Sequence, residues 1–111
     1  YYRPWGKYVN LFEGKNFLVK ELTVNSKSSI SLQKHNFRSE HWMITNGKPI
    51  ITLNKKKFYS KPNESIFVPK GAVHRIQNNF KIPVKIIEVQ TGPILKETDI
   101  IRFKDVYGRV K

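Results

Sequence analysis

The chain has 111 residues, no cysteine, and 21 basic against 8 acidic residues, which gives a formal net charge of +13. This length fits one domain with a single core, and the lack of cysteine excludes disulfides and thiolate metal sites. Because no apolar segment suits a signal peptide or a membrane span, we expect a cytoplasmic protein without a membrane partner. The basic residues are scattered and no nucleic-acid-binding motif occurs, which disfavours nucleic acid as a partner and favours attraction of a small anion.

Short runs rich in β-branched and aromatic residues, separated by turn-forming residues, predict an all-β protein of short antiparallel strands. The expected strands span residues 7–11, 17–24, 28–33, 40–45, 48–53, 65–68, 73–77, 84–90 and 99–103. Asn46-Gly47 suits a type I′ turn and predicts a hairpin between the strands on either side of it. Strands of this kind form an antiparallel sandwich or a small barrel.

Two clusters of polar residues carry metal-binding donors. They are Gln33-x-His35-x4-Glu40-x6-Gly47 and Pro69-x-Gly71-x2-His74-x3-Asn78. Two imidazoles, one carboxylate and one amide oxygen are the ligand set of a divalent-metal site with room for water or substrate. We therefore predict Gln33, His35, Glu40 and His74 as ligands of Zn²⁺, with Mn²⁺, Fe²⁺ and Co²⁺ as alternatives. The competing interpretation is a set of structural polar residues without a metal.

The two clusters resemble the paired motifs of cupins, which are small jelly-roll barrels, with glutamine at the place of the first histidine. Further segments resemble the C-terminal cupin domain of type II mannose-6-phosphate isomerases, usually fused behind a mannose-1-phosphate guanylyltransferase domain. These segments are Arg3-Pro4-Trp5-Gly6, Ser31-Leu32-Gln33, Arg38-Ser39-Glu40-His41-Trp42, Asn63-Glu64-Ser65, Ile87-Glu88-Val89-Gln90 and Asp99-Ile100-Ile101-Arg102-Phe103. The resemblance implies that residues 1–111 form a single cupin domain, an all-β jelly-roll barrel of short antiparallel strands.

The resemblance also implies an aldose–ketose isomerase that interconverts mannose 6-phosphate and fructose 6-phosphate and so feeds GDP-mannose and polysaccharide synthesis. Such a reaction needs a base that moves a proton between C1 and C2. Glu88 is the candidate base, because a carboxylate in the apolar run Ile86-Ile87-Glu88-Val89 is costly to bury unless it is paired or ligated. Lys20 is a second catalytic candidate, although an outward-facing lysine fits its strand equally well.

Five residues are candidates for contact with the phosphosugar substrate. Arg38 occupies the place of an active-site lysine in type I enzymes, which the chain also resembles through their Gln-x-His, Glu and His zinc ligands. It would steady a phosphate or an enediolate oxygen, or form a salt bridge at the rim. Ser31 alternates in phase with the predicted ligand Gln33. The others are Arg102, Tyr107 and Arg109, which could close over the sugar or simply lie on the surface.

The sequence is also compatible with other functions. One is a cupin of different specificity, such as another sugar-phosphate or nucleotide-sugar isomerase or epimerase. Phe37 favours this alternative because the subfamily commonly has a histidine there. Another is a non-catalytic cupin that binds a carbohydrate or assists a separate guanylyltransferase. Exposed sheet edges predict a homodimer in either case.

Overall fold

The computed structural model of the chain describes residues 1–104, which are built from twelve β-strands. The strands are β1 (Tyr2–Arg3), β2 (Gly6–Gly14), β3 (Phe17–Val24), β4 (Ser28–Ser29), β5 (Leu32–Lys34), β6 (Ser39–Asn46), β7 (Ile50–Leu53), β8 (Lys56–Tyr59), β9 (Ser65–Val68), β10 (His74–Asn78), β11 (Val84–Thr91) and β12 (Ile101–Lys104). Among these residues, no helix has the length and apolar character that a membrane crossing requires.

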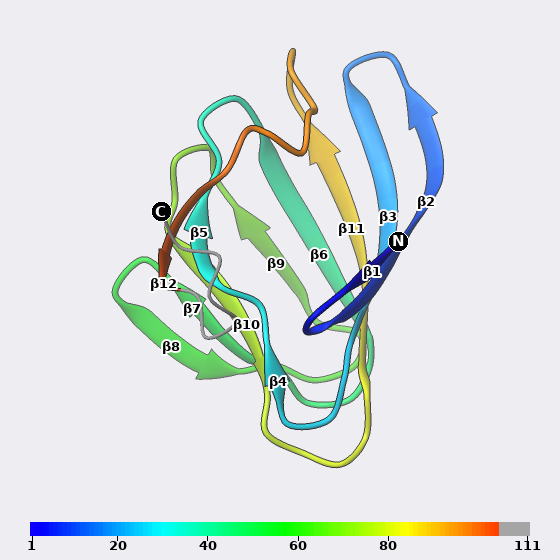
Figure 1. Cartoon of the computed structure of the whole chain (residues 1–111), viewed down its shortest axis with the longest axis vertical. Coiled ribbons are helices and arrows are strands. Elements are labelled where there is room, and N and C mark those ends of the chain that lie inside the picture. Colours follow the sequence, from blue (N-terminus) through cyan, green and yellow to red (C-terminus); the bar gives the residue numbers. More distant parts are fainter. Residues whose placement is uncertain (105–111) are drawn as a thin grey trace.

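The strands form two antiparallel sheets that face each other (Figure 1). The first sheet has the order β1-β2-β3-β11-β6-β9, and the second has the order β12-β5-β10-β7-β8, with β4 also paired to β10. The predicted all-β jelly roll is confirmed. Over the described strands, however, the two sheets form a jelly-roll-like sandwich and do not close into a continuous barrel.

The core follows from the alternation of side chains along the central strands. In β11, Val84, Ile86, Glu88 and Gln90 are buried, whereas the residues between them are only half-buried. Because successive side chains of a strand point to opposite faces, these four project between the sheets. The apolar core contains Trp5, Tyr8, Leu22, Val24, Ile30, Trp42, Ile44, Ile51, Ile66, Val68, Ala72, Ile76, Val84 and Ile86.

The predicted hairpin at Asn46-Gly47 is wrong. This turn joins β6, which pairs with β11 and β9, to β7, which pairs with β10 and β8 in the other sheet. Gly47 does have a positive φ of 82°, so the turn signal was real but directs the chain from one sheet to the other. The strand that follows in the chain, β7, forms a hairpin with β8 instead, and Asn54 in the turn between them lies in the left-handed region at φ 54°. Strand β8 was not predicted.

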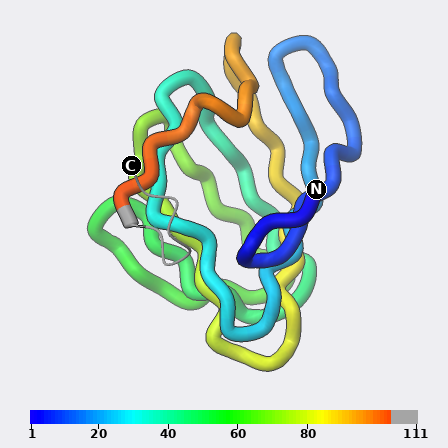
Figure 2. The backbone as a smooth tube through the Cα atoms, viewed as in Figure 1, coloured from blue at the N-terminus to red at the C-terminus, as the bar shows by residue number. Residues whose placement is uncertain are grey.

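Residues 92–100, between β11 and β12, cross from the first sheet to the second over one end of the sandwich (orange in Figures 1 and 2). Side-chain contacts fix this crossing segment in place. The Asp99 carboxylate accepts hydrogen bonds from the backbone N–H groups of Asn36 (2.8 Å) and Phe37 (2.9 Å). The segment therefore forms a wall across that end of the molecule.

Candidate functional site

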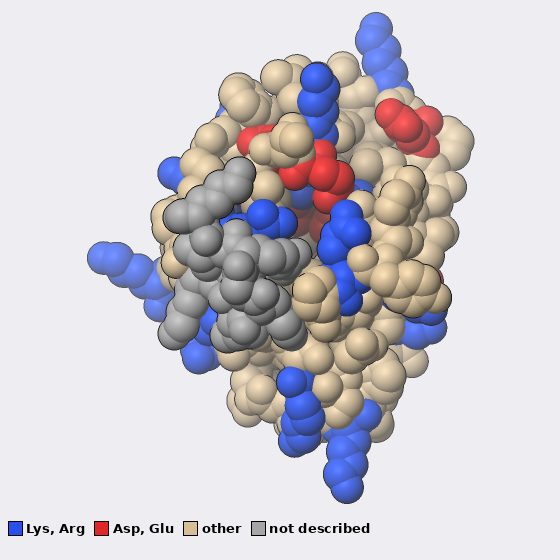
Figure 3. Space-filling view, viewed as in Figure 1, with Lys and Arg blue, Asp and Glu red and all other residues tan. Residues whose placement is uncertain are grey.

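A cavity of about 80 Å³ lies between the two sheets, with Glu97 and Ile100 of the crossing segment in its wall. This volume holds several water molecules, since one water needs roughly 10–15 Å³ by the same kind of measure. The polar lining consists of Arg3, Tyr8, Lys20, Ser31, Gln33, His35, Arg38, Glu40, His74, Glu88, Gln90, Glu97 and Arg102, with Trp5 and Trp42. Figure 3 shows basic and acidic side chains gathered around a hollow on this face.

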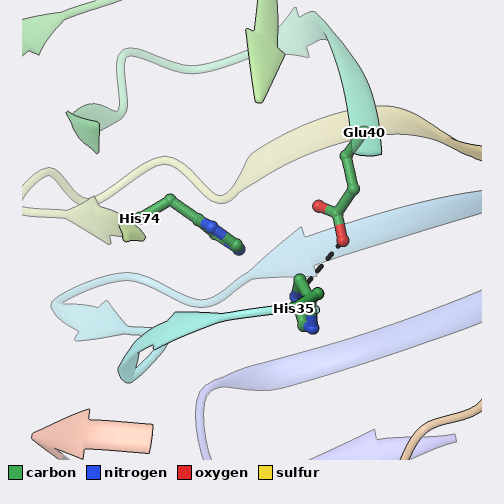
Figure 4. Close-up of side chains that lie close together, drawn as sticks. All are labelled: His35, Glu40 and His74. Atoms are coloured by element: carbon green, nitrogen blue, oxygen red, sulfur yellow. Dashed lines mark ion pairs between the residues drawn. The ribbon is translucent and has the colours of Figure 1, made fainter. Parts of the chain in front are cut away.

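Three predicted ligands meet inside this cavity. One ligand atom from each of His35, Glu40 and His74 lies within 4.8 Å of the others, and all three residues are buried (Figure 4). Glu40 comes from β6 of the first sheet, whereas His74 begins β10 and His35 follows β5 in the second sheet. The fourth predicted ligand, Gln33, is opposite His74 in the β5–β10 register and lines the same cavity. The three could therefore hold a metal ion, with Gln33 beside them.

Backbone carbonyls fix the orientation of both imidazoles. His35 Nδ1 lies 2.6 Å from the carbonyl oxygen of Asp99, and His74 Nδ1 lies 3.0 Å from that of Ala72. A carbonyl only accepts, so each Nδ1 carries the proton and each Nε2 presents its lone pair. Contacts of this kind orient the histidine ligands of metal sites.

The charge states also suit a cation. Burial by itself would raise the pKa of the Glu40 carboxyl, but the Arg38 guanidinium and the two imidazoles outweigh it and lower that pKa to about 2. Burial lowers the pKa of His35 to about 4, and burial also lowers the pKa of His74. At neutral pH the site thus offers one ionised carboxylate and two neutral imidazoles, the forms that bind a metal.

Arg38 lies inside the cavity and is only 7% exposed, so it does not form a salt bridge at the rim. Its Nε donates to Glu40 Oε2 (2.9 Å), and its Nη2 donates to His35 Nε2 (3.1 Å). The guanidinium therefore contacts two of the atoms that would face a metal.

Glu88 is buried in the same cavity, as its apolar strand predicted. Burial, followed by the charge of Glu40, raises its pKa to about 8. Gln90, two residues further along β11, donates from Nε2 to Glu88 Oε2 at 2.9 Å. Glu88 is thus a carboxyl group poised to exchange a proton near neutral pH.

Lys20 does not face outward. It is opposite Glu88 in the β3–β11 register and is 3% exposed. Its ammonium forms an ion pair with Glu97 and lies 4.2 Å from the centre of the Tyr8 ring. The cavity lining therefore includes the Lys20 ammonium as well as the guanidinium groups of Arg3, Arg38 and Arg102.

The remaining predicted residues fall in different places. Ser31 is buried in the cavity, and its hydroxyl has no hydrogen-bond partner within residues 1–104. Arg102 lines the cavity from β12, opposite Gln33. Tyr107 and Arg109 lie outside the described residues. Phe37 is 47% exposed and lies outside the cavity wall.

Three residues that were not predicted to have a functional role complete the site. Gln90 orients Glu88, and the i, i+2 alternation from Glu88 could have indicated it. Trp42, which belongs to the apolar core, also donates from Nε1 to Glu40 Oε1 at 2.9 Å. Asp99 orients His35 through its carbonyl, and no local sequence pattern marks such a contact across 64 residues.

A jelly roll with a buried His/Glu/His cluster between its sheets defines a cupin-type protein. The family described as "Mannose-6-phosphate isomerase C-terminal" matches residues 1–105, and the chain belongs to this family. The predicted family is therefore confirmed.

The chain is similar to longer curated proteins. It is 47% identical over 108 residues to the alginate biosynthesis protein AlgA of Pseudomonas putida, covering 97% of this chain and 22% of AlgA. It is 44% identical over 109 residues to the mannose-1-phosphate guanylyltransferase ManC of Salmonella typhimurium, covering 98% of this chain and 23% of ManC. The chain thus spans about a fifth of the length of these relatives.

The fold is also similar to that of a solved structure, a sugar phosphate isomerase from a cupin superfamily of Silicibacter pomeroyi. The TM-score is 0.64 at 19% identity, covering 68% of this chain and 50% of the other. At this identity the likeness shows a shared cupin fold.

Proposed function

We propose that this chain is a metal-dependent aldose–ketose isomerase domain that interconverts mannose 6-phosphate and fructose 6-phosphate. The observation that carries the proposal is the burial of Glu88 in the same cavity as His35, Glu40 and His74. A carboxyl group buried beside a second one is costly for stability, and such costs are typical of active sites. The family to which the chain belongs supports the same function.

Glu88 would act as the base. Its pKa of about 8 leaves roughly a tenth of the molecules ionised at pH 7. The ionised carboxylate takes the proton from C2 of the open-chain aldose and returns it to C1, while a proton passes from O2 to O1. The same group serves both steps because the two carbons are adjacent.

Other cavity residues would orient Glu88 and the sugar. The hydrogen bond from Gln90 Nε2 holds one oxygen of the Glu88 carboxyl, and Gln90 Oε1 is buried without a partner within residues 1–104. The hydroxyl of Ser31 is likewise buried and has no hydrogen-bond partner within residues 1–104. Unpaired buried polar atoms are costly, and hydroxyl groups of a sugar would satisfy both of these.

The donors fit a divalent metal. His35, Glu40, His74 and Gln33 would hold it, with Zn²⁺ as the expected ion and Mn²⁺, Fe²⁺ and Co²⁺ as alternatives. Once bound, the ion would polarise the carbonyl and hydroxyl oxygens of the sugar. Arg38 would position Glu40 through the hydrogen bond at 2.9 Å, while giving up its contact with the lone pair of His35.

A coupled assay with purified protein tests this function. We expect conversion of mannose 6-phosphate that a chelator abolishes and added Zn²⁺ restores, and we expect His74→Ala to lose both metal content and turnover. A panel of other sugar phosphates and nucleotide sugars run in parallel separates a different specificity. Absence of metal-dependent turnover with every substrate would leave a non-catalytic cupin, acting beside a guanylyltransferase such as the one for which the ManC relative is named.

A further inference from the structure

One side of the cavity is cationic and lies apart from the candidate metal ligands. The Arg3 guanidinium donates to the hydroxyl of Tyr8 (3.1 Å) and lies 5.1 Å from the centre of the Tyr8 ring. The Lys20 ammonium lies 4.2 Å from the same ring. Two cations thus surround one aromatic side chain in the cavity wall.

The ion pair at this position is asymmetric. The side chain of Lys20 is 4% exposed, whereas that of its partner Glu97 is 53% exposed. Lys20 is fixed within β3, while Glu97 reaches it from the crossing segment. An exposed carboxylate can return to water at little cost, but a buried ammonium needs an anion at all times.

Arg38 and Arg3 differ in how well they are suited to receive an anion. The charge of Arg38 is already neutralised by an ion pair with Glu40, in which Arg38 Nε lies 2.9 Å from Glu40 Oε2. Arg3, in contrast, forms no ion pair with any carboxylate in residues 1–104, since its contacts are with the Tyr2 carbonyl and the Tyr8 hydroxyl. An incoming anion at Lys20 would therefore also meet a guanidinium that no carboxylate of residues 1–104 neutralises.

The cationic residues and the candidate metal ligands come from different strands. Lys20 on β3 is in register with Glu88 on β11, which is in register with Trp42 on β6. Two strand spacings separate Lys20 from β6, which carries the candidate ligand Glu40, so the backbones are roughly 10 Å apart. The phosphate on C6 and the metal near C1 and C2 would therefore be bound by side chains from different strands.

We propose that Lys20 and Arg3 form the subsite for the phosphate group of the substrate, and that Glu97 occupies this subsite until the phosphate displaces it. The proposal rests on the proposed function for the identity of the sugar. It assigns the phosphate to Lys20 and Arg3 in place of Arg102, Tyr107 and Arg109, for which the sequence had suggested contact with the substrate. Lys20 is then a binding residue, and Glu97 is an internal competitor of the substrate.

Phosphate binding tests the proposal without any requirement for turnover. Inorganic phosphate, mannose 6-phosphate and mannose are titrated calorimetrically into chelator-treated protein, so that phosphate cannot bind to a metal. We expect Glu97→Gln to tighten binding of both phosphate compounds up to about fivefold, the range of a partly exposed ion pair. We expect Lys20→Met to weaken them by about tenfold or more, as for the loss of a charge-assisted hydrogen bond, with weak mannose binding unchanged.

Matched variants control for net charge and for folding. Glu13→Gln removes the same charge at an exposed position outside the cavity, and it should leave phosphate binding unchanged. Lys20→Arg keeps the cation and should retain binding if Lys20→Met is poorly folded. Weaker or unchanged phosphate binding in Glu97→Gln, relative to Glu13→Gln, would overturn the proposal, as would unchanged binding in Lys20→Met. Neither result would depend on whether the protein is an isomerase.

Discussion

The two ends of the central strands bury different kinds of side chain, although both follow the same alternation. At one end the inward positions of β3, β11 and β6 hold Leu22, Ile86 and Ile44. At the other end they hold the polar residues Lys20, Glu88, Gln90 and Glu40, together with Leu18 and Trp42. Both groups are buried to a similar extent. The burial pattern alone therefore does not distinguish the core from the candidate site; the chemistry of the buried residues does.

This difference teaches where stability and function reside. Apolar side chains stabilise the fold when they leave water, whereas each buried charge costs several kcal/mol that its partner offsets only in part. We infer that the apolar end supplies most of the stability of the sandwich. The polar end is retained for its chemistry.

The largest effect is expected from Glu88→Gln at the polar end. Isomerase turnover should fall by about 10²- to 10⁴-fold, the usual contribution of a general base, whereas the free energy of unfolding should stay equal or rise because a buried ionisable group is removed. The coupled assay and urea unfolding measure the two quantities. Turnover close to that of the unmodified protein would show that Glu88 is not the base, with Glu13→Gln as the control for charge.

Next in size is Ile86→Ala, at the apolar end of the same strand. The free energy of unfolding should decrease by about 2–5 kcal/mol, because the substitution leaves a cavity among fully buried residues. The metal content of the folded protein, measured by elemental analysis, should not change. A loss of metal with little loss of stability would contradict the division between the two ends.

A pH effect of a few kcal/mol is expected from Glu88 in metal-free protein. Its pKa rises from 4.5 in the unfolded chain to about 8 in the folded protein, so the folded state holds the extra proton between these values and stability falls as pH rises through them. One pKa unit corresponds to about 1.4 kcal/mol. Urea unfolding of the chelator-treated protein from pH 5 to 8 should show this decline relative to Glu88→Gln, and parallel curves would refute it.

The pH comparison must be made against Glu88→Gln because His35 acts in the opposite direction. Its pKa falls from 6.5 to about 4 on folding, so the unfolded chain holds the extra proton and stability is lost as pH falls from about 6.5 to 4. This contribution is common to both proteins and cancels in the difference.

The smallest effect is expected from His41→Ala. His41 is exposed, and its ring packs against Phe67 with 4.6 Å between the ring centres. The change should alter the free energy of unfolding by less than about 0.5 kcal/mol and should leave metal content intact. His74→Ala, at the first residue of β10 and inside the cavity, is the matched comparison and should lose the metal.

Much of the fold could be predicted because it depends on local patterns. The bounds of β3 and β9 agree with the predicted ranges, and the inward orientation of Glu88 follows from period-2 alternation. Ser31, Gln33 and His35 all line the cavity as predicted, even though the expected strand is interrupted between β4 and β5.

The errors came from information that is not local. A turn at Asn46-Gly47 has the same sequence whether the next strand pairs back or passes to the opposite sheet, and only the partners of β6 and β7 decide between these outcomes. The partner of Lys20 lies 77 residues away, and Glu97 has no pattern that marks it. The structure was needed to show that both belong to one cavity.

The crossing segment links features that would otherwise be independent. The carbonyl oxygen of Asp99 accepts a hydrogen bond from His35 Nδ1, and that of Lys96 accepts one from the guanidinium of Arg38. The side chain of Glu97 forms the ion pair with Lys20. An insertion or deletion in these few residues would therefore disturb the candidate metal ligands and the anion-binding side of the cavity at the same time. Redesign of this loop for a new substrate must preserve the spacing of its three contact residues, Lys96, Glu97 and Asp99. A substitution at only one of them would disturb the other two contacts least.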